Sequence, residues 1–155
     1  MKLDPETDLT FTRKLNAPRD LLWDCWTTPR HVMQFFMPKP HKLEGCEIDL
    51  RAGGRFNTVM NVYGDRIENE GVFLEIVPKA RLVFTDSYSE GWKPAADPFM
   101  TAIIDFADAR DGGTTYTATA RHRSVEARQK HEDMGFFDGW GTVATQLEAY
   151  AQRLS

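Results

Sequence analysis

The chain ends in one long amphipathic segment, and this feature constrains the fold more than any other. Over residues 136–154, apolar side chains recur three and four residues apart, which is the spacing of one face of an α-helix. This stripe consists of Phe136, Trp140, Val143, Leu147, Tyr150 and Leu154. A helix with one apolar face is stable only when another layer covers that face. The rest of the chain must therefore supply an apolar layer.

Most of the remaining chain has the pattern of β-strands. Residues 8–17 alternate apolar and polar side chains, and strand-like segments follow at 46–65, 71–88 and 99–123. The expected turns lie at Gly53-Gly54, Tyr63–Asp65, Pro78-Lys79 and Asp111–Gly113. Residues 89–98 are expected to form a loop. The sequence therefore predicts about six strands in hairpins after the first strand.

Two short helices are expected between the first strand and these hairpins. Residues 17–28 carry apolar side chains at helical spacing, and Thr28 and Pro29 are typical of the cap and first position of a second helix over 29–36. With the last helix, this order predicts an α+β fold in which a curved antiparallel sheet holds a long C-terminal helix. We expect a single domain over residues 1–155.

The segment "MGFFDGWG" places glycines among the largest apolar side chains of the last helix. Each glycine within a helix costs roughly 0.5–1 kcal/mol relative to alanine. Gly135 and Gly139 are four residues apart and therefore lie on one flank. They could allow backbone to approach closely, so that the three aromatic side chains of this segment form one wall of a chamber. Alternatively, Gly135 ends a preceding helix and the aromatics are ordinary core. The sequence leaves both interpretations open.

The composition excludes several classes of protein. A net charge of −4 and a pI near 5.6 argue against nucleic acid or an anionic membrane as a partner. No apolar run approaches the ~20 residues of a membrane span, and the N-terminus lacks the apolar region of a secretory signal. Cys25 and Cys46 have no metal-binding spacing, and a reduced buried thiol is expected at Cys25. We expect a cytoplasmic protein and leave a homodimer open.

The motifs for metal, phosphate and nucleophile chemistry are all incomplete. The segment "HEDMG" begins like the zinc motif H-E-x-x-H, but Gly135 stands where the second histidine is needed. The segment "RAGGRF" lacks the frame of a phosphate-binding loop and favours a bulge or tight hairpin. No G-x-S-x-G motif is present, and neither cysteine lies in a recognisable reactive setting. We therefore expect no metal and no cofactor, and assign no catalytic residue.

A few polar residues could still face the interior of such a fold. Strand alternation places His122 on one face with Tyr116 and Ala120, where it could orient a ligand or move a proton near neutral pH. The alternative, which the sequence favours, is a solvated histidine at a strand end. Glu70, Asp86 and Asp105 could also face inward, but we favour salt bridges to Arg81, Arg121 or Arg123.

Five segments in this order carry a family resemblance. They are "APRDLLWDCWTTPRHVMQFFMP", "DLRAGGRF", "GVFLEIVPKARLVFTD", "GGTTYTATARH" and "HEDMGFFDGWG". Together they resemble the START-like, helix-grip superfamily often labelled SRPBCC, within the branch named after the activator of heat-shock protein 90 ATPase. The resemblance implies a seven-stranded antiparallel sheet that grips the C-terminal helix around an internal cavity.

Superfamily members include lipid-transfer proteins, plant hormone and allergen proteins, polyketide cyclases and aromatases. The co-chaperone that names the branch carries an additional N-terminal domain, for which 155 residues leave no room. We therefore do not take the branch name as a function.

The leading hypothesis is binding or transport of a small hydrophobic molecule in the cavity. The expected lining residues are Phe36, Phe56, Phe84, Met100, Phe137 and Trp140, with His122 as a polar contact. One alternative is a cyclase, dehydratase or hydrolase-like enzyme acting on an aromatic or polyketide-like substrate. Another is a co-chaperone-like interaction domain, for which we expect an exposed apolar patch and a cavity filled by the protein's own side chains.

Overall fold

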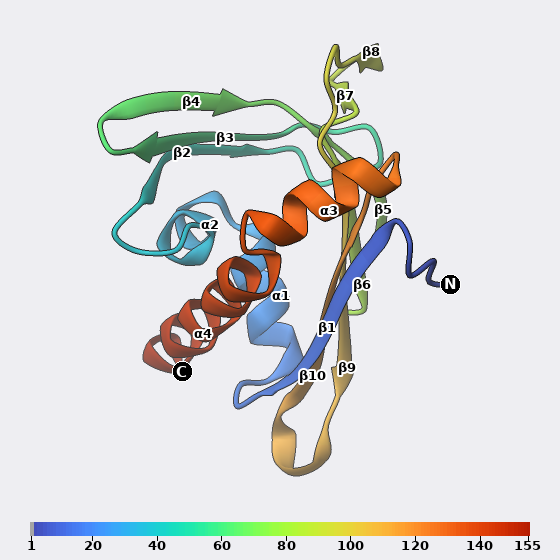
Figure 1. The fold of residues 1–155 in the computed structure, drawn as a ribbon. Coiled ribbons are helices and arrows are strands. Elements are labelled where there is room, and N and C mark those ends of the chain that lie inside the picture. Colours follow the sequence, from blue (N-terminus) through green and yellow to red (C-terminus); the bar gives the residue numbers. More distant parts are fainter. Residues whose placement is uncertain (1) are drawn as a thin grey trace.

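The computed structural model describes residues 2–155 and consists of two main antiparallel sheets and four α-helices (Figure 1). The larger sheet has the strand order β1-β10-β9-β6-β5, and the smaller one β2-β3-β4. The strands are β1 (Asp8–Leu15), β2 (Lys42–Ile48), β3 (Phe56–Val62), β4 (Asp65–Asn69), β5 (Val72–Val77), β6 (Arg81–Thr85), β7 (Tyr88–Ser89), β8 (Lys93–Pro94), β9 (Thr101–Asp108) and β10 (Thr114–Arg121). The helices are α1 (Arg19–Thr27), α2 (Pro29–Phe35), α3 (Val125–Asp133) and α4 (Phe136–Leu154), with a short 3-10 turn η1 (Arg110–Gly112).

The two sheets are joined between β3 and β5. The backbone N–H of Phe56 donates to the carbonyl of Gly71 at 2.9 Å, and that of Phe73 donates to the carbonyl of Gly54 at 3.0 Å. Figure 1 shows that the sheets meet at a corner, with β2, β3 and β4 turned across one end of the larger sheet. Helix α4 runs along the concave side of this corner. The predicted curved antiparallel sheet around a long C-terminal helix is therefore confirmed.

The region expected to be a loop between β6 and β9 contains a small hairpin. Strands β7 and β8 pair Tyr88 with Pro94 in an antiparallel register. The tight turn between them depends on positive φ angles of 86° at Gly91 and 62° at Trp92. The rings of Tyr88 and Trp92 also contact each other edge-on, with centroids 5.8 Å apart. The expectation of an irregular loop was therefore wrong at Ser89, Lys93 and Pro94, which pair in this hairpin.

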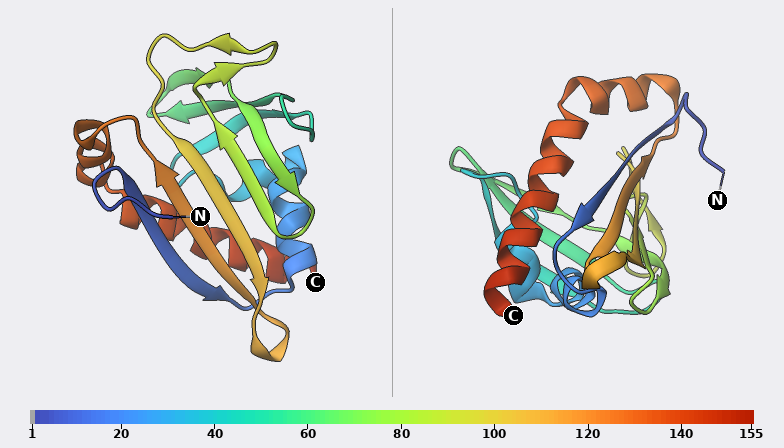
Figure 2. Two further views of the ribbon diagram at one scale, coloured as in Figure 1. Left: turned by 90° about the vertical axis from the view of Figure 1, so that its right-hand side faces the viewer. Right: turned by 90° about the horizontal axis from the view of Figure 1, so that it is seen from below.

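Gly135 separates helices α3 and α4. Its φ of 95° lies in the left-handed region, which glycine adopts without a steric penalty. Figure 2 shows that the chain changes direction between the two helices at this point. A Cβ atom built on Gly135 or Gly139 would meet nothing within 4 Å. The interpretation that these glycines admit a closely approaching backbone was therefore wrong, and Gly139 instead leaves open space beside the helix.

The core fills the space between the larger sheet, α1, α2 and the second half of α4. Leu15, Trp26, Tyr116 and Leu147 are fully buried there. The Trp26 ring packs edge-on against Phe35, with centroids 5.2 Å apart. This end of the molecule is closed by its own side chains.

Two further expectations concern the cysteines and membrane-spanning helices. Both cysteines are free thiols, and burial raises the pKa of the Cys25 thiol to about 11. The expected reduced thiol at Cys25 is therefore confirmed. In the described part of the chain, no helix is both long enough and apolar enough to cross a membrane.

Candidate ligand-binding cavity

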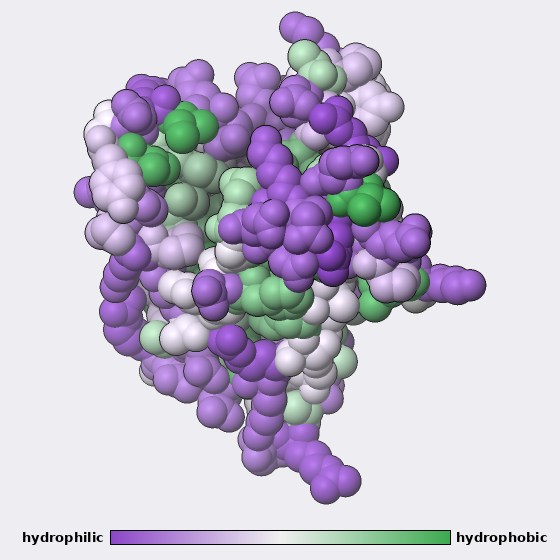
Figure 3. Space-filling model, in the orientation of Figure 1, coloured by the Kyte–Doolittle hydropathy of each residue, from purple (hydrophilic) through white to green (hydrophobic). Residues whose placement is uncertain are grey.

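A cavity of about 410 Å³ lies between the concave sides of the two sheets and the helices α2, α3 and α4. Figure 3 shows a recess with hydrophobic atoms between the three-stranded sheet and the α3–α4 pair. Of the residues predicted to line a cavity, the structure brings Phe36, Phe56, Phe84, Met100 and Trp140 together around this space. They come from the end of α2, from β3, from β6, from the segment before β9, and from α4.

The aromatic lining residues pack against one another. Phe36 contacts Phe56 and Trp140 with ring centroids 5.9 Å and 6.2 Å away, and Phe56 packs edge-on against Phe84 at 4.7 Å. Tilted and edge-on contacts between rings are the favoured arrangements of aromatic pairs. Each of these four rings therefore packs against at least one other lining ring. Gly139 adds no side chain on the helix side, so the cavity stays open.

Phe137 does not line the cavity, which corrects that expectation. Its side chain is 48% exposed and contacts the ring of Phe136, whose centroid is 5.0 Å away. Phe136 takes the expected place in the lining and is only 2% exposed. At about 100° per residue, Phe136 and Phe137 flank Trp140 on opposite sides, about 40° and 60° away around the helix. The orientation of α4 turns the Phe136 side towards the cavity and the Phe137 side towards solvent.

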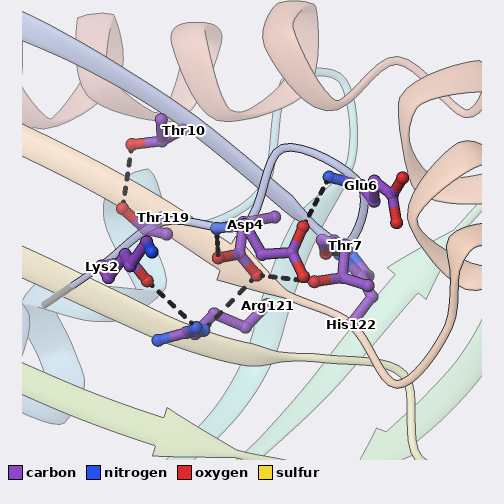
Figure 4. Close-up of polar contacts among 9 residues, drawn as sticks. Lys2, Asp4, Glu6, Thr7, Thr10, Thr119, Arg121 and His122 are labelled. Carbon is purple, nitrogen blue, oxygen red and sulfur yellow. Dashed lines mark hydrogen bonds and ion pairs between the residues drawn. The ribbon is translucent and has the colours of Figure 1, made fainter.

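His122 is buried at the end of β10, and the favoured expectation of a solvated side chain was wrong. It is 8% exposed and does not itself line the large cavity. Its Nδ1 lies 2.8 Å from the carbonyl oxygen of Thr7, and its Nε2 lies 2.8 Å from Nδ1 of His131. Figure 4 shows Thr7 and His122 in the polar cluster at this end of β1 and β10, where Arg121 contacts the Lys2 carbonyl.

His131 is a polar lining residue that sequence reasoning missed, as it missed Thr58, Asn69 and Thr85. It was considered only as part of an incomplete metal motif, yet its ring lines the cavity and is 6% exposed. Its ring centroid lies 4.5 Å from that of Phe99 and 5.2 Å from that of Phe136. Burial, followed by the neighbouring His122, lowers the pKa of His131 to about 4. The imidazole is therefore neutral near pH 7.

Comparison with known proteins places this chain in a family. The sequence pattern of the Activator of Hsp90 ATPase homolog 1-like proteins matches residues 16–152. The chain belongs to this family. No curated protein matches it.

Solved structures of other proteins share this fold. A protein from Nitrosomonas europaea is 40% identical, with 98% of each chain covered and a TM-score of 0.95. A protein from Mycobacterium smegmatis is 28% identical, with 96% of this chain and 93% of that chain covered and a TM-score of 0.78. An AHSA1-like protein from Aeromonas hydrophila, at 16% identity and a TM-score of 0.71 over 95% and 93% of the chains, shows the fold alone.

Of the three carboxylates considered for the interior, Asp86 and Asp105 have structural partners. Glu70 lies in the cavity lining, and within residues 2–155 it forms no salt bridge to Arg81, Arg121 or Arg123, so the favoured interpretation was wrong for Glu70. Asp105 accepts a hydrogen bond from Nε of Arg81 at 2.7 Å, as the favoured interpretation predicted. Asp86 lies at the cavity but accepts the backbone N–H groups of Phe99 and Met100, at 2.9 Å and 3.1 Å through Oδ1. Its side chain therefore positions the segment before β9. The site is mainly an apolar space, with the imidazole of His131 and a few other polar side chains in its wall, namely those of Thr58, Asn69, Glu70, Thr85 and Asp86.

Proposed function

We propose that this protein binds a small hydrophobic molecule in the cavity beside α4. The observation that carries this proposal is an unfilled space of about 410 Å³ with a lining dominated by aromatic and aliphatic side chains. Small-molecule sites typically have volumes of roughly 300–1,000 Å³ and an apolar lining with few polar groups. Removing apolar ligand surface from water would contribute roughly 25 cal/mol per Å², before the costs of ordering are subtracted.

The cavity supports ligand binding over the two alternatives. A co-chaperone-like interaction domain was expected to fill its interior with its own side chains, and this interior is open. An enzyme that works by general acid–base catalysis needs a titratable group in the cavity, close to a carboxylate or another partner. The histidine that lines the space is hydrogen-bonded to a second histidine, and its lowered pKa of about 4 makes it a weak proton acceptor near neutral pH.

The first test is native mass spectrometry of freshly purified protein, which should show a co-purified small molecule. The second is a fluorescence titration with the apolar probe N-phenyl-1-naphthylamine. A leucine at Gly139 would project into the open space beside the helix, so Gly139→Leu should strongly weaken probe binding.

Asp138→Leu is the matched control, because Asp138 is exposed on the same helix and does not line the cavity. It should leave probe affinity unchanged. Equal affinities in the two folded variants would place the probe outside the cavity and contradict the proposal.

A further inference from the structure

The direction of the hydrogen bonds through His122 follows from its contact with the backbone. Nδ1 of His122 lies 2.8 Å from the carbonyl oxygen of Thr7. A carbonyl oxygen accepts hydrogen bonds and cannot donate, so this nitrogen must carry the proton. In a neutral imidazole the other nitrogen is then an acceptor. Nε2 of His122 is therefore available only to accept.

The hydrogen bond to His122 also determines which nitrogen of His131 carries the proton. Nδ1 of His131 lies 2.8 Å from Nε2 of His122, so it must donate the proton of that hydrogen bond. The proton of neutral His131 therefore sits on Nδ1, and its Nε2 carries an unshared electron pair. Across residues 2–155, no group of the protein hydrogen-bonds to this Nε2. The ring that bears it is part of the cavity wall.

The reverse arrangement would require a charge in an apolar setting. If His131 accepted at Nδ1, both nitrogens of His122 would have to carry protons, and His122 would be a cation. His122 and His131 are only 8% and 6% exposed, and the Phe99 ring lies beside both, with centroids 6.2 Å and 4.5 Å away. Burying a charge is costly unless the charge is paired, and within residues 2–155 no carboxylate forms a hydrogen bond or ion pair with either ring.

We propose that the relay from the Thr7 carbonyl through His122 holds Nε2 of His131 as a hydrogen-bond acceptor, and that the cavity thereby selects apolar ligands that carry a hydroxyl or phenol donor. This inference rests on the proposed function and names the ligand class of the same cavity. His131 contacts the ligand, whereas His122 is a positioning residue that sets the proton on its neighbour.

The selectivity arises because an acceptor left without a donor loses its hydrogen bonds to water. An alcohol replaces those bonds, whereas an ether or hydrocarbon of similar shape displaces water and leaves Nε2 unpaired. One hydrogen bond of this kind changes affinity on the order of ten-fold. Sites built to hydrogen-bond a substrate discriminate well against analogues that lack the bonding group.

The binding test compares 1-naphthol with 1-methoxynaphthalene by calorimetry on the intact protein. The wild-type protein should bind the naphthol on the order of ten-fold more tightly than its methyl ether. In His131→Phe the two probes should bind equally, because the acceptor is gone and the aromatic volume stays. His41→Phe, which removes a histidine outside the cavity, should keep the wild-type preference. His131→Leu serves the same purpose if the phenylalanine variant does not fold.

The relay itself can be tested without any ligand. Long-range proton–nitrogen NMR spectra show which ring nitrogen of each histidine carries the proton. In the wild-type protein at pH 7, both His122 and His131 should be protonated on Nδ1. In His122→Phe, the signal of His131 should shift towards a mixture of tautomers, and the preference for naphthol should weaken.

The outcomes separate this inference from the proposed function. If both probes bind with equal affinity to the wild-type protein, or if His131 carries its proton on Nε2, the cavity binds hydrophobic molecules without the proposed selection and the inference is overturned. If neither probe binds while the tautomers are as expected, the ligand-binding proposal fails, and the donor selection that depends on it fails as well.

Discussion

The two halves of helix α4 face very different surroundings. In the second half, Ala144, Leu147 and Ala151 are fully buried against the core beneath the larger sheet. In the first half, Gly139 and Trp140 border an open cavity. Alanines let the helix pack closely at one end, whereas at the other the space beside Gly139 is not taken up by any side chain. The comparison shows that one amphipathic stripe can both close a core and border a binding space.

The sheet contributes as much to this difference as the helix. The smaller sheet turns away from the larger one at the β3–β5 junction (Figures 1 and 2). Pairing is irregular between Leu43 and Gly45 in β2, and between Phe73 and Glu75 in β5. Bulges bend strands and increase their twist, so a straight helix cannot follow the whole surface. The cavity lies where helix and sheet diverge.

The largest effect on stability should come from the second half of α4, where the core is closed. Leu147→Ala removes a fully buried side chain and should lower the free energy of unfolding by about 2–5 kcal/mol. Because Leu147 does not line the cavity, the affinity for an apolar probe should stay the same in the folded protein. Urea unfolding and probe titration measure the two quantities. A strong loss of affinity would show that the two ends of α4 are not independent.

Trp140→Ala tests the open end. The indole is only partly buried, so the loss of stability should fall below the roughly 3–5 kcal/mol of a fully buried tryptophan. The affinity for the probe should fall at the same time, because one wall of the cavity is lost. Compared with Leu147→Ala, this variant should therefore show a larger loss of probe affinity by calorimetry and a smaller loss of stability by urea unfolding. An unchanged affinity would show that Trp140 is a core residue that takes no part in binding the probe.

A smaller loss of stability should appear at acid pH. Burial, with His122, lowers the pKa of His131 in the folded state to about 4 from 6.5. Below pH 6.5 the unfolded chain binds a proton at His131 that the folded protein does not. The free energy of unfolding therefore decreases as the pH is lowered from 6.5 to about 4. Urea unfolding at pH 7.5 and 4.5 should show a steeper loss for the wild-type protein than for His131→Phe. Equal losses would mean that His131 titrates normally.

The smallest effect should come from Gly139→Ala. Replacing a helical glycine should stabilise the helix by roughly 0.5–1 kcal/mol, and the new methyl group meets no neighbour. The same methyl group takes up cavity volume, so probe affinity should fall modestly while stability rises.

Gly141→Ala is the control, since Gly141 lies outside the cavity and its Cβ would approach only the guanidinium group of Arg13, at 3.1 Å from Nη2. It should leave affinity unchanged. A loss of affinity in both variants would mean that helix rigidity, and not filled volume, controls binding.

The fold was predictable because its signals are local. The spacing of apolar residues in α4 gave its bounds at Phe136 and Leu154, and the turns after β5 and β9 lie at the predicted prolines and glycines. Five of the expected lining positions surround one cavity, since side-chain alternation and helical spacing determine the inward face. Their role in binding a ligand stays a prediction.

The remaining features depend on how distant segments meet. The direction of α3 depends on the left-handed turn at Gly135, and this turn brings His131 against His122 and into the cavity wall. No periodic pattern in the sequence links these two histidines, because they belong to different elements. For the same reason, the outward position of Phe137 became clear only once the rotation of α4 about its axis was known.

The sequence by itself therefore determined the order of strands and helices, the family resemblance and most of the apolar inner face, since each depends on neighbouring residues along the chain. Only the tertiary structure decided that the interior is hollow and that an imidazole edge lines it. A cavity and a hydrogen-bond relay are set by distances between elements that the sequence separates, and no local pattern encodes those distances.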